Sequence, residues 1–462
     1  MLVFREELSK LPAVGKLVNE LEFQALIEEH GRVLVTDAIR KSIDFARSEI
    51  LAGRSRPDIS ARSVQNWIQE LKLLSLRDVI NATGVVIHTN LGRAPLAASA
   101  QKAVAHVSYG YSSLEFSLKT GKRGSRHDHV EDLLTELLGT TKAIALNNCA
   151  GAVFVSLAAI CKSKEVIIAR GELVEIGGGF RVPDIMTESG ALMKEVGTTN
   201  RVHLKDYENA ITEETAAILV VHRSNFAILG FTAHPGVAAL SELAKKHNIP
   251  LLVDVGSGLI AEYEIFGEAG KQLRDEPRPQ DVLGQGADLV MFSGDKLLGG
   301  PQSGIIAGSE ELVGKVRSHP LARALRMDKL GLAALEATLM LYRDGKEHEI
   351  PVIRDLSASA AVIEERAHEL QKLLSRTFSD LSVNVEKGDS VVGGGSLPLV
   401  RLPSFLVTLS SPSYSAEVLS RRLRTTRPAL IARTVDDKVT LDLRSIPSSS
   451  FSMLLEILKE SL

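Results

Sequence analysis

The sequence predicts an α/β protein with a mostly parallel sheet, preceded by a helical region and followed by a smaller α+β domain. Short apolar runs alternate with helical stretches through the middle of the 462-residue chain, and this alternation is typical of a parallel sheet. The runs are five or six residues long and cover 143–147, 165–169, 191–196, 216–221, 250–254, 288–292 and 304–308. Ligands of such sheets bind at the carboxyl ends of the strands.

The region before this pattern is helical in character. Val35, Ile39 and Ile43 recur at a spacing of four residues, which predicts one buried helix face, and Gly53 is placed to stop that helix. Up to residue 60 this region has nine Lys/Arg and ten Asp/Glu residues, so its charge assigns it no function.

The last part of the chain mixes helical and extended patterns. Helices are expected over 329–343, 357–375 and 451–462, and extended segments over 399–401, 405–409 and 439–443. The Gly-rich stretch 388–398 is expected to be a loop. We therefore expect three parts, at residues 1–76, 77–345 and 346–462.

Composition excludes several classes of protein. With 54 basic and 57 acidic side chains the net charge is −3, which lacks the basic excess of most nucleic-acid-binding proteins. Two cysteines, Cys149 and Cys161, are too few for a disulfide framework or a zinc site, so no metal is expected. The first residues show no signal pattern, and no window approaches the roughly 18 apolar residues of a membrane span. We expect a cytoplasmic protein without a membrane partner.

The most informative segment follows the run 288–292 and places Lys296 among Gly and Ser residues. Most lysines are solvated surface groups, but this one lies at the exit of an apolar strand, where small neighbours let a planar ligand approach. A lysine in this setting is suited to form a Schiff base with pyridoxal phosphate and then to remove the α-proton of a substrate.

Asp254 ends the run 250–254 and is expected at the same edge of the sheet. A carboxylate there would keep the pyridine nitrogen of the cofactor protonated, which makes the ring a better electron sink. The alternative is a helix N-cap, since Gly256-Ser257-Gly258 follows.

A phosphate cradle is expected where the segment 147–153 runs from a strand into a helix. The backbone amides of Asn148, Cys149 and Ala150 at a helix start, together with the helix dipole, would bind a phosphate. Ser293 is expected to add a hydroxyl group. Cys149 is interpreted as a small packing residue, because no basic partner adjoins it.

Arginines form a second group of candidates. Arg93 lies in a Gly-containing turn, and Arg323 and Arg326 are three residues apart on one expected helix face. The arginine fork suits phosphate-like anions, although ordinary salt bridges explain these residues equally well. Arg123 and Arg126 would serve an anion or RNA in the same way.

Several long motifs resemble bacterial selenocysteine synthase, the L-seryl-tRNA(Sec) selenium transferase family. They cover 81–96, 114–126, 170–184, 195–201 and 292–304, and the likeness extends over nearly the whole chain. The resemblance implies a pyridoxal-phosphate enzyme of fold type I with a seven-stranded sheet. One departure is that Cys149 and Gly151 interrupt a run that usually reads as Asn then Ala; backbone amides would do the binding, so neither should abolish it.

The resemblance also implies a mechanism. Serine carried on the selenocysteine tRNA replaces Lys296 in the aldimine, Lys296 removes the α-proton, and hydroxide leaves. Selenium from selenophosphate then adds to the resulting aminoacrylyl group, and the product is L-selenocysteinyl-tRNA(Sec).

Individual roles are implied in the same way. Arg93, Arg323 and Arg326 match positions that hold selenophosphate, and Asp295 matches a catalytic carboxylate. His222 is the candidate for stacking on the cofactor ring. The N-terminal helices match the part that grips the tRNA, and the family assembles as a homodecamer.

Two other functions remain open. One is a pyridoxal-phosphate lyase or transferase for a free small amino acid, whose carboxylate Arg433 or Arg444 would meet; the N-terminal helices favour the tRNA substrate over this reading. The other is a non-catalytic tRNA-binding protein, against which the presence of both Lys296 and Asp254 argues.

Overall fold

The computed structural model describes residues 2–177 and 179–462, so Met1 and Gly178, the latter within one of the family-like motifs, lie outside the described residues. The chain divides into two compact units, one ending at Asp78 and one beginning at Val79. The three-part division expected from the sequence stays a prediction, and the two units are described separately.

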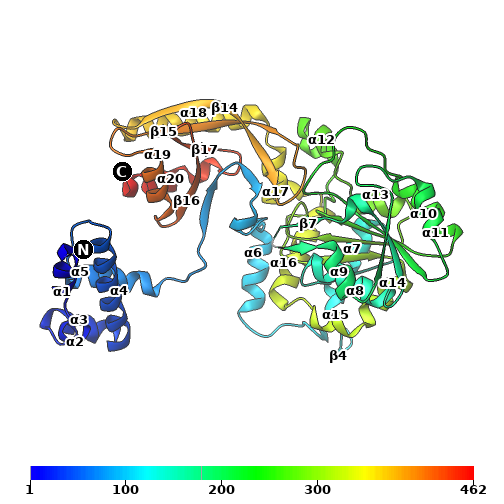
Figure 1. The fold of residues 1–462 in the computed structure, drawn as a ribbon, viewed down its shortest axis with the longest axis horizontal. Helices are drawn as coiled ribbons and strands as arrows, with labels where there is room; N and C mark the ends of the chain where they lie inside the picture. The colour runs from blue at the N-terminus through cyan, green and yellow to red at the C-terminus, as the bar shows by residue number, and fades with distance from the viewer. Residues whose placement is uncertain (1, 178) are drawn as a thin grey trace. The chain divides into compact units, whose positions relative to one another are not determined.

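The first unit is a small helical bundle with its own core (Figure 1). Its helices are α1 (Leu2–Ser9), α2 (Val14–Leu17), α3 (Leu21–His30), α4 (Arg32–Leu51) and α5 (Ala61–Lys72). The predicted stripe of Val35, Ile39 and Ile43 is buried on α4, packed with Phe23 of α3. The helix ends just before Gly53, whose φ of 76° is the left-handed conformation common after helix ends.

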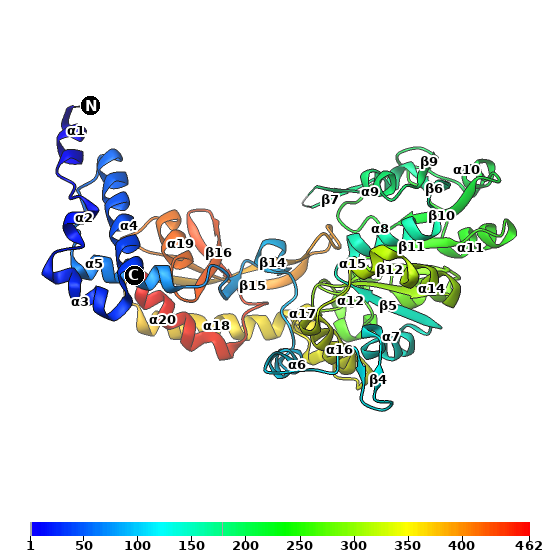
Figure 2. The ribbon, with the colours of Figure 1, turned by 90° about the horizontal axis from the view of Figure 1, so that it is seen from below.

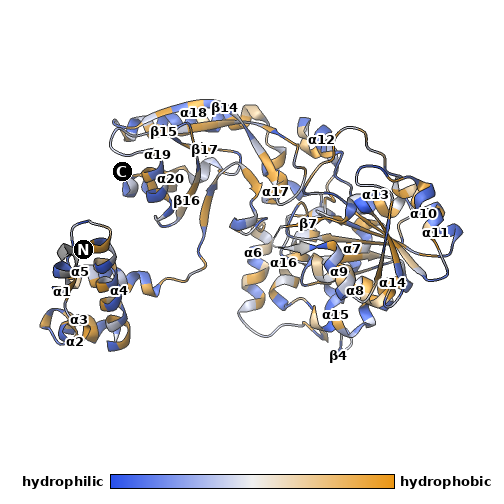
Figure 3. Ribbon diagram, in the orientation of Figure 1, coloured by the Kyte–Doolittle hydropathy of each residue, from blue (hydrophilic) through white to orange (hydrophobic). Residues whose placement is uncertain are grey.

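The second unit contains the expected seven-stranded sheet. Its strands are β5 (Lys142–Leu146), β6 (Glu165–Ala169), β9 (Leu192–Val196), β10 (Thr215–Val221), β11 (Leu251–Gly256), β12 (Leu289–Ser293) and β13 (Gly304–Gly308). The spatial order is β5-β13-β12-β11-β10-β6-β9, and only β13 runs antiparallel to its neighbours. The prediction of a mostly parallel sheet is confirmed, and Figure 3 shows hydrophobic residues concentrated in its strands.

Helices cover both faces of this sheet (Figure 1). One face packs against α7 (Glu131–Leu138), α10 (Leu204–Ala210), α11 (Val237–Lys246), α13 (Pro279–Gly284) and α16 (Lys329–Arg343). The other packs against α8 (Cys149–Ile160), α9 (Val182–Glu188), α14 (Glu310–Ser318) and α15 (Pro320–Ala324).

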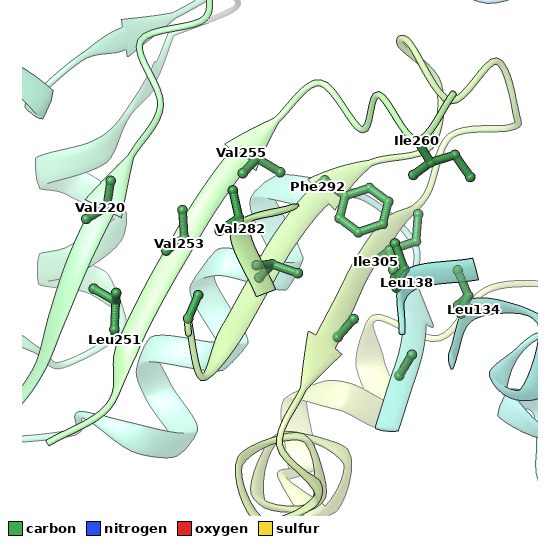
Figure 4. Close-up of a cluster of buried hydrophobic side chains, with 14 of the residues drawn as sticks. Leu134, Leu138, Val220, Leu251, Val253, Val255, Ile260, Val282, Phe292 and Ile305 are labelled. Atoms are coloured by element: carbon green, nitrogen blue, oxygen red, sulfur yellow. The ribbon is translucent and has the colours of Figure 1, made fainter. Parts of the chain in front are cut away.

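Alternation along the strands decides which face each side chain joins. On β11, Val253 and Val255 belong to the core on the α7 face, part of which is drawn in Figure 4, whereas Leu252 belongs to the core on the α8 face. Asp254 therefore points to the α8 face.

Smaller elements complete this region. They are α6 (Ala98–Ser108), α12 (Glu268–Leu273), and two short hairpins, β3–β4 (Phe116–Ser117 with Lys122–Arg123) and β7–β8 (Glu175–Ile176 with Phe180–Arg181).

A six-stranded sheet forms the C-terminal part, in the order β1-β16-β17-β15-β14-β2. Its strands are β1 (Val79–Ala82), β2 (Val85–Ile87), β14 (Ser382–Gly393), β15 (Leu402–Ser410), β16 (Ala429–Val435) and β17 (Lys438–Asp442). Helices α18 (Ala360–Thr377), α19 (Ala416–Arg424) and α20 (Phe451–Ser461) bury its core, α17 (Pro351–Ser357) precedes them, and Figure 2 shows α18 and α20 along the sheet.

Two details differ from the sequence-based expectations. Residues 79–87 hydrogen-bond to the C-terminal sheet, although the sequence groups them with the large domain. Residues 388–393 continue strand β14 instead of forming a loop, and residues 399–401 precede β15 without joining it. A glycine within this strand is explained by packing, because a Cβ at Gly388 would lie 2.4 Å from Leu406 Cδ1 of the neighbouring strand β15.

Within the described residues, no helix is both long enough and apolar enough to cross a membrane.

Candidate active site

One cavity of about 230 Å³ gathers most of the predicted site residues at the carboxyl ends of β5, β11 and β12. Its lining consists of Arg93, Asn148, Cys149, Ala150, Val153, Ile176, Gly177, Asp254, Gly256, Ser293, Lys296 and Gln302. The location agrees with the rule that open α/β sheets bind ligands beyond their carboxyl ends.

Lys296 lies in a tight turn that follows β12. The Leu297 N–H donates to the Ser257 carbonyl at 3.0 Å, and the Tyr342 hydroxyl donates to the Leu298 carbonyl at 2.8 Å. Gly294 is required in this turn, because a Cβ there would lie 2.0 Å from Ser303 Oγ and 2.8 Å from the backbone carbonyl oxygen of Pro301. Lys296 is 9% exposed, and no carboxylate of the described chain forms an ion pair with its amine. The amine is therefore available to a ligand in the cavity.

Asp254 supplies a buried carboxylate to the same cavity and is 5% exposed. Burial raises the pKa of Asp254 to about 6, while the positive charge of Lys296 and the Gly256 N–H act in the opposite direction. A carboxylate this deeply buried gains most from a cationic hydrogen-bond donor, and a protonated pyridine nitrogen is such a donor. The residues present thus fit pyridoxal phosphate.

Helix α8 begins at the cavity and offers backbone donors. The Asn148 side chain accepts a hydrogen bond from the Gly151 N–H at 2.7 Å, and the Asn148 carbonyl accepts one from the Ala152 N–H at 3.0 Å. The amides of Cys149 and Ala150 are left for an anion at the positive end of the helix dipole. Gly304 lets the chain pass beneath this turn, since a Cβ there would lie 2.1 Å from the Asn148 carbonyl oxygen.

Asp295 is buried beside the cavity and is held from two sides. Arg93 Nη1 lies 2.5 Å from Asp295 Oδ2, and the Ser293 hydroxyl donates to Oδ1 at 2.6 Å. The only proton of the Ser293 hydroxyl is therefore used on Asp295, although the sequence suggested a phosphate contact. Arg93 has a φ of 63°, and such left-handed strain in a non-glycine residue is common at functional sites.

His222 does not join this cavity. Its backbone N–H donates to the Asp254 carbonyl at 2.8 Å, but its ring lines a different cavity of about 230 Å³, which also has Glu172 and His234 in its lining. Strand alternation explains the difference: Val221 packs on the α8 face, so the next residue points to the α7 face, opposite Asp254. The position of His222 therefore gives no support to ring stacking.

Arg323 and Arg326 also lie outside the cavity lining, at the end of α15. They are close to the cradle, because the Asn147 N–H donates to the Leu325 carbonyl at 2.8 Å. Arg326 Nη1 pairs with Glu115 Oε1 at 3.0 Å.

Glu115 is a residue that the sequence did not single out. Its carboxylate also pairs with Arg126 at 2.7 Å and with Arg123 at 2.9 Å, and these arginines lower its pKa. Three arginines on one carboxylate leave a local excess of positive charge. A lone acidic residue within the arginine-rich motif 114–126 was the available signal.

Gln302 and Ile176 were missed as well, although both line the cavity. Both lie in motifs that carry the family resemblance, but an uncharged side chain gives no indication in the sequence that it lines a binding site.

The two-sided sheet, the lysine after β12, the aspartate on β11 and the helix start at α8 together define a pyridoxal-phosphate-dependent enzyme of fold type I. A solved structure of D-glucosaminate-6-phosphate ammonia-lyase has a similar fold, with a TM-score of 0.58 and 20% identity over 88% of this chain and 98% of that one.

The chain belongs to the L-seryl-tRNA selenium transferase family, whose model matches residues 79–447. A second model, selenocysteine synthase N terminal, matches residues 8–47. The L-seryl-tRNA(Sec) selenium transferase of Clostridium botulinum (strain Hall) is 42% identical over 99% of both chains. The proteins of that name from Geotalea uraniireducens and Alkaliphilus metalliredigens are 43% and 44% identical, each over 98% of both chains. The family expected from the sequence is confirmed, and membership supports pyridoxal phosphate as the cofactor.

Proposed function

We propose that this chain converts L-seryl-tRNA(Sec) into L-selenocysteinyl-tRNA(Sec), with pyridoxal phosphate as cofactor and selenophosphate as selenium donor. The observation that carries the proposal is a single cavity that holds the Lys296 amine, the buried Asp254 carboxylate and the start of helix α8. Full-length likeness to proteins named L-seryl-tRNA(Sec) selenium transferase supports the substrate.

Pyridoxal phosphate, when bound, supplies an aldehyde that captures the amino group of the substrate and a ring that accepts electrons from its α-carbon. Lys296 holds the cofactor and moves the α-proton. Asp254 keeps the ring nitrogen protonated, and the Cys149 and Ala150 amides bind the phosphate. Asp295 holds Arg93 at the cavity wall through the 2.5 Å ion pair.

Selenophosphate is a small, highly charged anion and needs fixed cations. Of the three candidate arginines, Arg93 lines the cavity itself. Arg323 and Arg326 lie beside the turn that leads into α8. Bidentate arginine contacts are suited to phosphate-like groups. We assign these three arginines to the donor.

The helical first unit is the proposed grip on the tRNA. It has a core of its own, and a separate family model matches it. The proposed assembly is a homodecamer in the cytoplasm, in which one tRNA reaches the cavity of one subunit and the helices of another.

A free amino acid is a less suitable substrate for this cavity. Its carboxylate would need an arginine of the C-terminal part, and Arg444 is already committed there. Arg444 is 2% exposed and donates to the carbonyl groups of Asp355, Ala358 and Pro403 at 2.6–3.0 Å. Arg433 points to the buried Asp442, with its Nη2 3.6 Å from Oδ2.

A direct comparison of substrates tests the proposal. The holoenzyme is given seryl-tRNA(Sec) with labelled selenophosphate, and in parallel free serine or cysteine. Selenium should enter the aminoacyl group of the tRNA, with little turnover of the free amino acids. Rapid turnover of free amino acid without selenium transfer to tRNA would overturn the proposal.

A further inference from the structure

Cys149 stands out among the cavity residues because the proposed chemistry uses its backbone only. It is the first residue of helix α8, and its side chain contacts that of Asp254 on β11. Cys149 Sγ is 3.8 Å from Asp254 Oδ1, within the range for a hydrogen bond that involves sulfur. Both side chains line the Lys296 cavity.

The thiol keeps its proton in this position. Burial, reinforced by the negative charge of Asp254, raises the pKa of Cys149 well above its ordinary value, and the opposing effect of Lys296 is smaller. A protonated thiol beside a carboxylate has one possible polarity, in which the S–H donates and the carboxylate oxygen accepts.

We propose that Cys149 is a positioning residue for the cofactor: its S–H and the Gly256 N–H hold the Asp254 carboxylate in the orientation that meets the pyridine nitrogen. This rests on the proposed function only in that the ring nitrogen faces Asp254. The thiol acts through Asp254 and does not need to touch the reacting atoms.

The alternative is that Cys149 only fills space at the start of α8. Substitutions distinguish the two roles. The packing role depends on the volume of the side chain, whereas the positioning role depends on a hydrogen-bond donor at this position. Cys149→Ala removes the donor, whereas Cys149→Ser and Cys149→Asn restore one. Cys161 is buried at the end of the same helix, and its side chain makes no hydrogen bond within the described residues, so Cys161→Ala is the matched control.

The first measurement is the cofactor affinity and the pH titration of the visible absorbance of the bound cofactor. Cys149→Ala should bind pyridoxal phosphate about 2- to 10-fold more weakly, the range for loss of one hydrogen bond, and should shift the titration midpoint. Cys149→Ser, Cys149→Asn and Cys161→Ala should stay close to the parent protein. Unchanged affinity and titration in Cys149→Ala, or a Cys149→Ser variant as impaired as Cys149→Ala, would overturn the positioning role.

The second measurement needs no cofactor. The S–H stretch of the Cys161→Ala protein reports Cys149 alone in the infrared spectrum, and a hydrogen bond to Asp254 lowers its frequency. Adding Asp254→Ala should raise that frequency, and an unchanged frequency would contradict the contact. Failure of the parent protein to bind pyridoxal phosphate would instead count against the proposed function, so the two failures are distinguishable.

Discussion

Arg93 and Asp295 are 202 residues apart in the sequence, yet Arg93 Nη1 and Asp295 Oδ2 lie 2.5 Å apart in the structure. The pair joins the turn after β2 to the turn that presents Lys296. Its position at the cavity wall couples the arginine proposed to bind the donor with the residue next to the proposed catalytic lysine. The Asp295 side chain is only 9% exposed, whereas that of Arg93 is 35% exposed. Loss of the arginine contact would therefore leave a buried carboxylate without its cationic partner.

Replacing Asp295 by Asn should release Arg93 while keeping the size of the side chain. We expect the KM for selenophosphate to rise about tenfold or more, on the scale of a lost charge-assisted hydrogen bond. Steady-state selenium transfer measures this value. Ser293→Ala, which removes only the hydrogen bond to the other oxygen, should have a smaller effect, and equal losses would contradict the central place of the ion pair.

Lys296→Ala should give a colourless protein with unchanged secondary structure. Borohydride treatment of the parent protein should fix the cofactor covalently on the peptide that contains Lys296, as mass spectrometry of the digest will show. Covalent label on another lysine would refute the assignment. Lys329 is a suitable control position, because it does not line the cavity. Its amine donates a hydrogen bond of 3.0 Å to the Gly110 carbonyl.

The buried Asp254 predicts a pH-dependent stability of the cofactor-free protein. Burial raises the pKa of Asp254 from 3.8 to about 6, so ionisation opposes folding. This penalty is absent below the unfolded pKa near 4, grows as the pH rises, and is complete above about 6. Relative to Asp254→Asn, the parent should therefore lose thermal stability between pH 4 and pH 6. A constant difference in melting temperature across this range would rule out the raised pKa.

Arg326→Ala should impair the use of selenophosphate more than release of hydroxide from the serine moiety. The reason is that Arg326 is proposed to contact the donor and not the seryl group. Single-turnover assays with and without selenophosphate separate the two steps. Arg123→Ala is the control, because Arg123 pairs with the same Glu115 carboxylate but has a side chain that is 75% exposed. Equal loss of both steps in Arg326→Ala would contradict the donor role.

Removal of residues 1–78 should weaken the binding of selenocysteine tRNA while the cofactor stays bound. The contacts divide the chain at this point, so the deletion leaves the second unit whole. Filter binding and cofactor absorbance provide the two readouts. A shortened protein with full tRNA affinity would exclude the first unit as the grip.

The sheet and its two main site residues could be predicted from the sequence because buried parallel strands leave continuous apolar runs. Each of the seven runs overlaps a strand of the sheet, and the helix expected over 329–343 is present as α16. Lys296 and Asp254 share a cavity because both follow or end such strands. The apolar runs do not predict which cavity a residue just beyond a strand end lines: His222, the candidate for ring stacking, lines a different cavity from Lys296.

Long-range pairing escaped prediction for a similar reason. The residues around Glu115 in the sequence do not predict its ion pair with Arg326, and those around Arg93 do not predict its ion pair with Asp295. Each contact depends on how distant segments fold together. In the C-terminal part, the glycines of 388–398 led to the prediction of a loop. Gly388 instead lies inside a strand, where it makes room for Leu406.

The strand β1 has a consequence for how the protein is made. Val79 of β1 pairs with Ala429 of β16. Strand β1 therefore cannot form its hydrogen bonds to β16 until nearly the whole chain has been translated. Contacts this distant slow folding. A nascent chain stalled before β16 would carry an unpaired strand edge just upstream of Arg93, open to association with other chains.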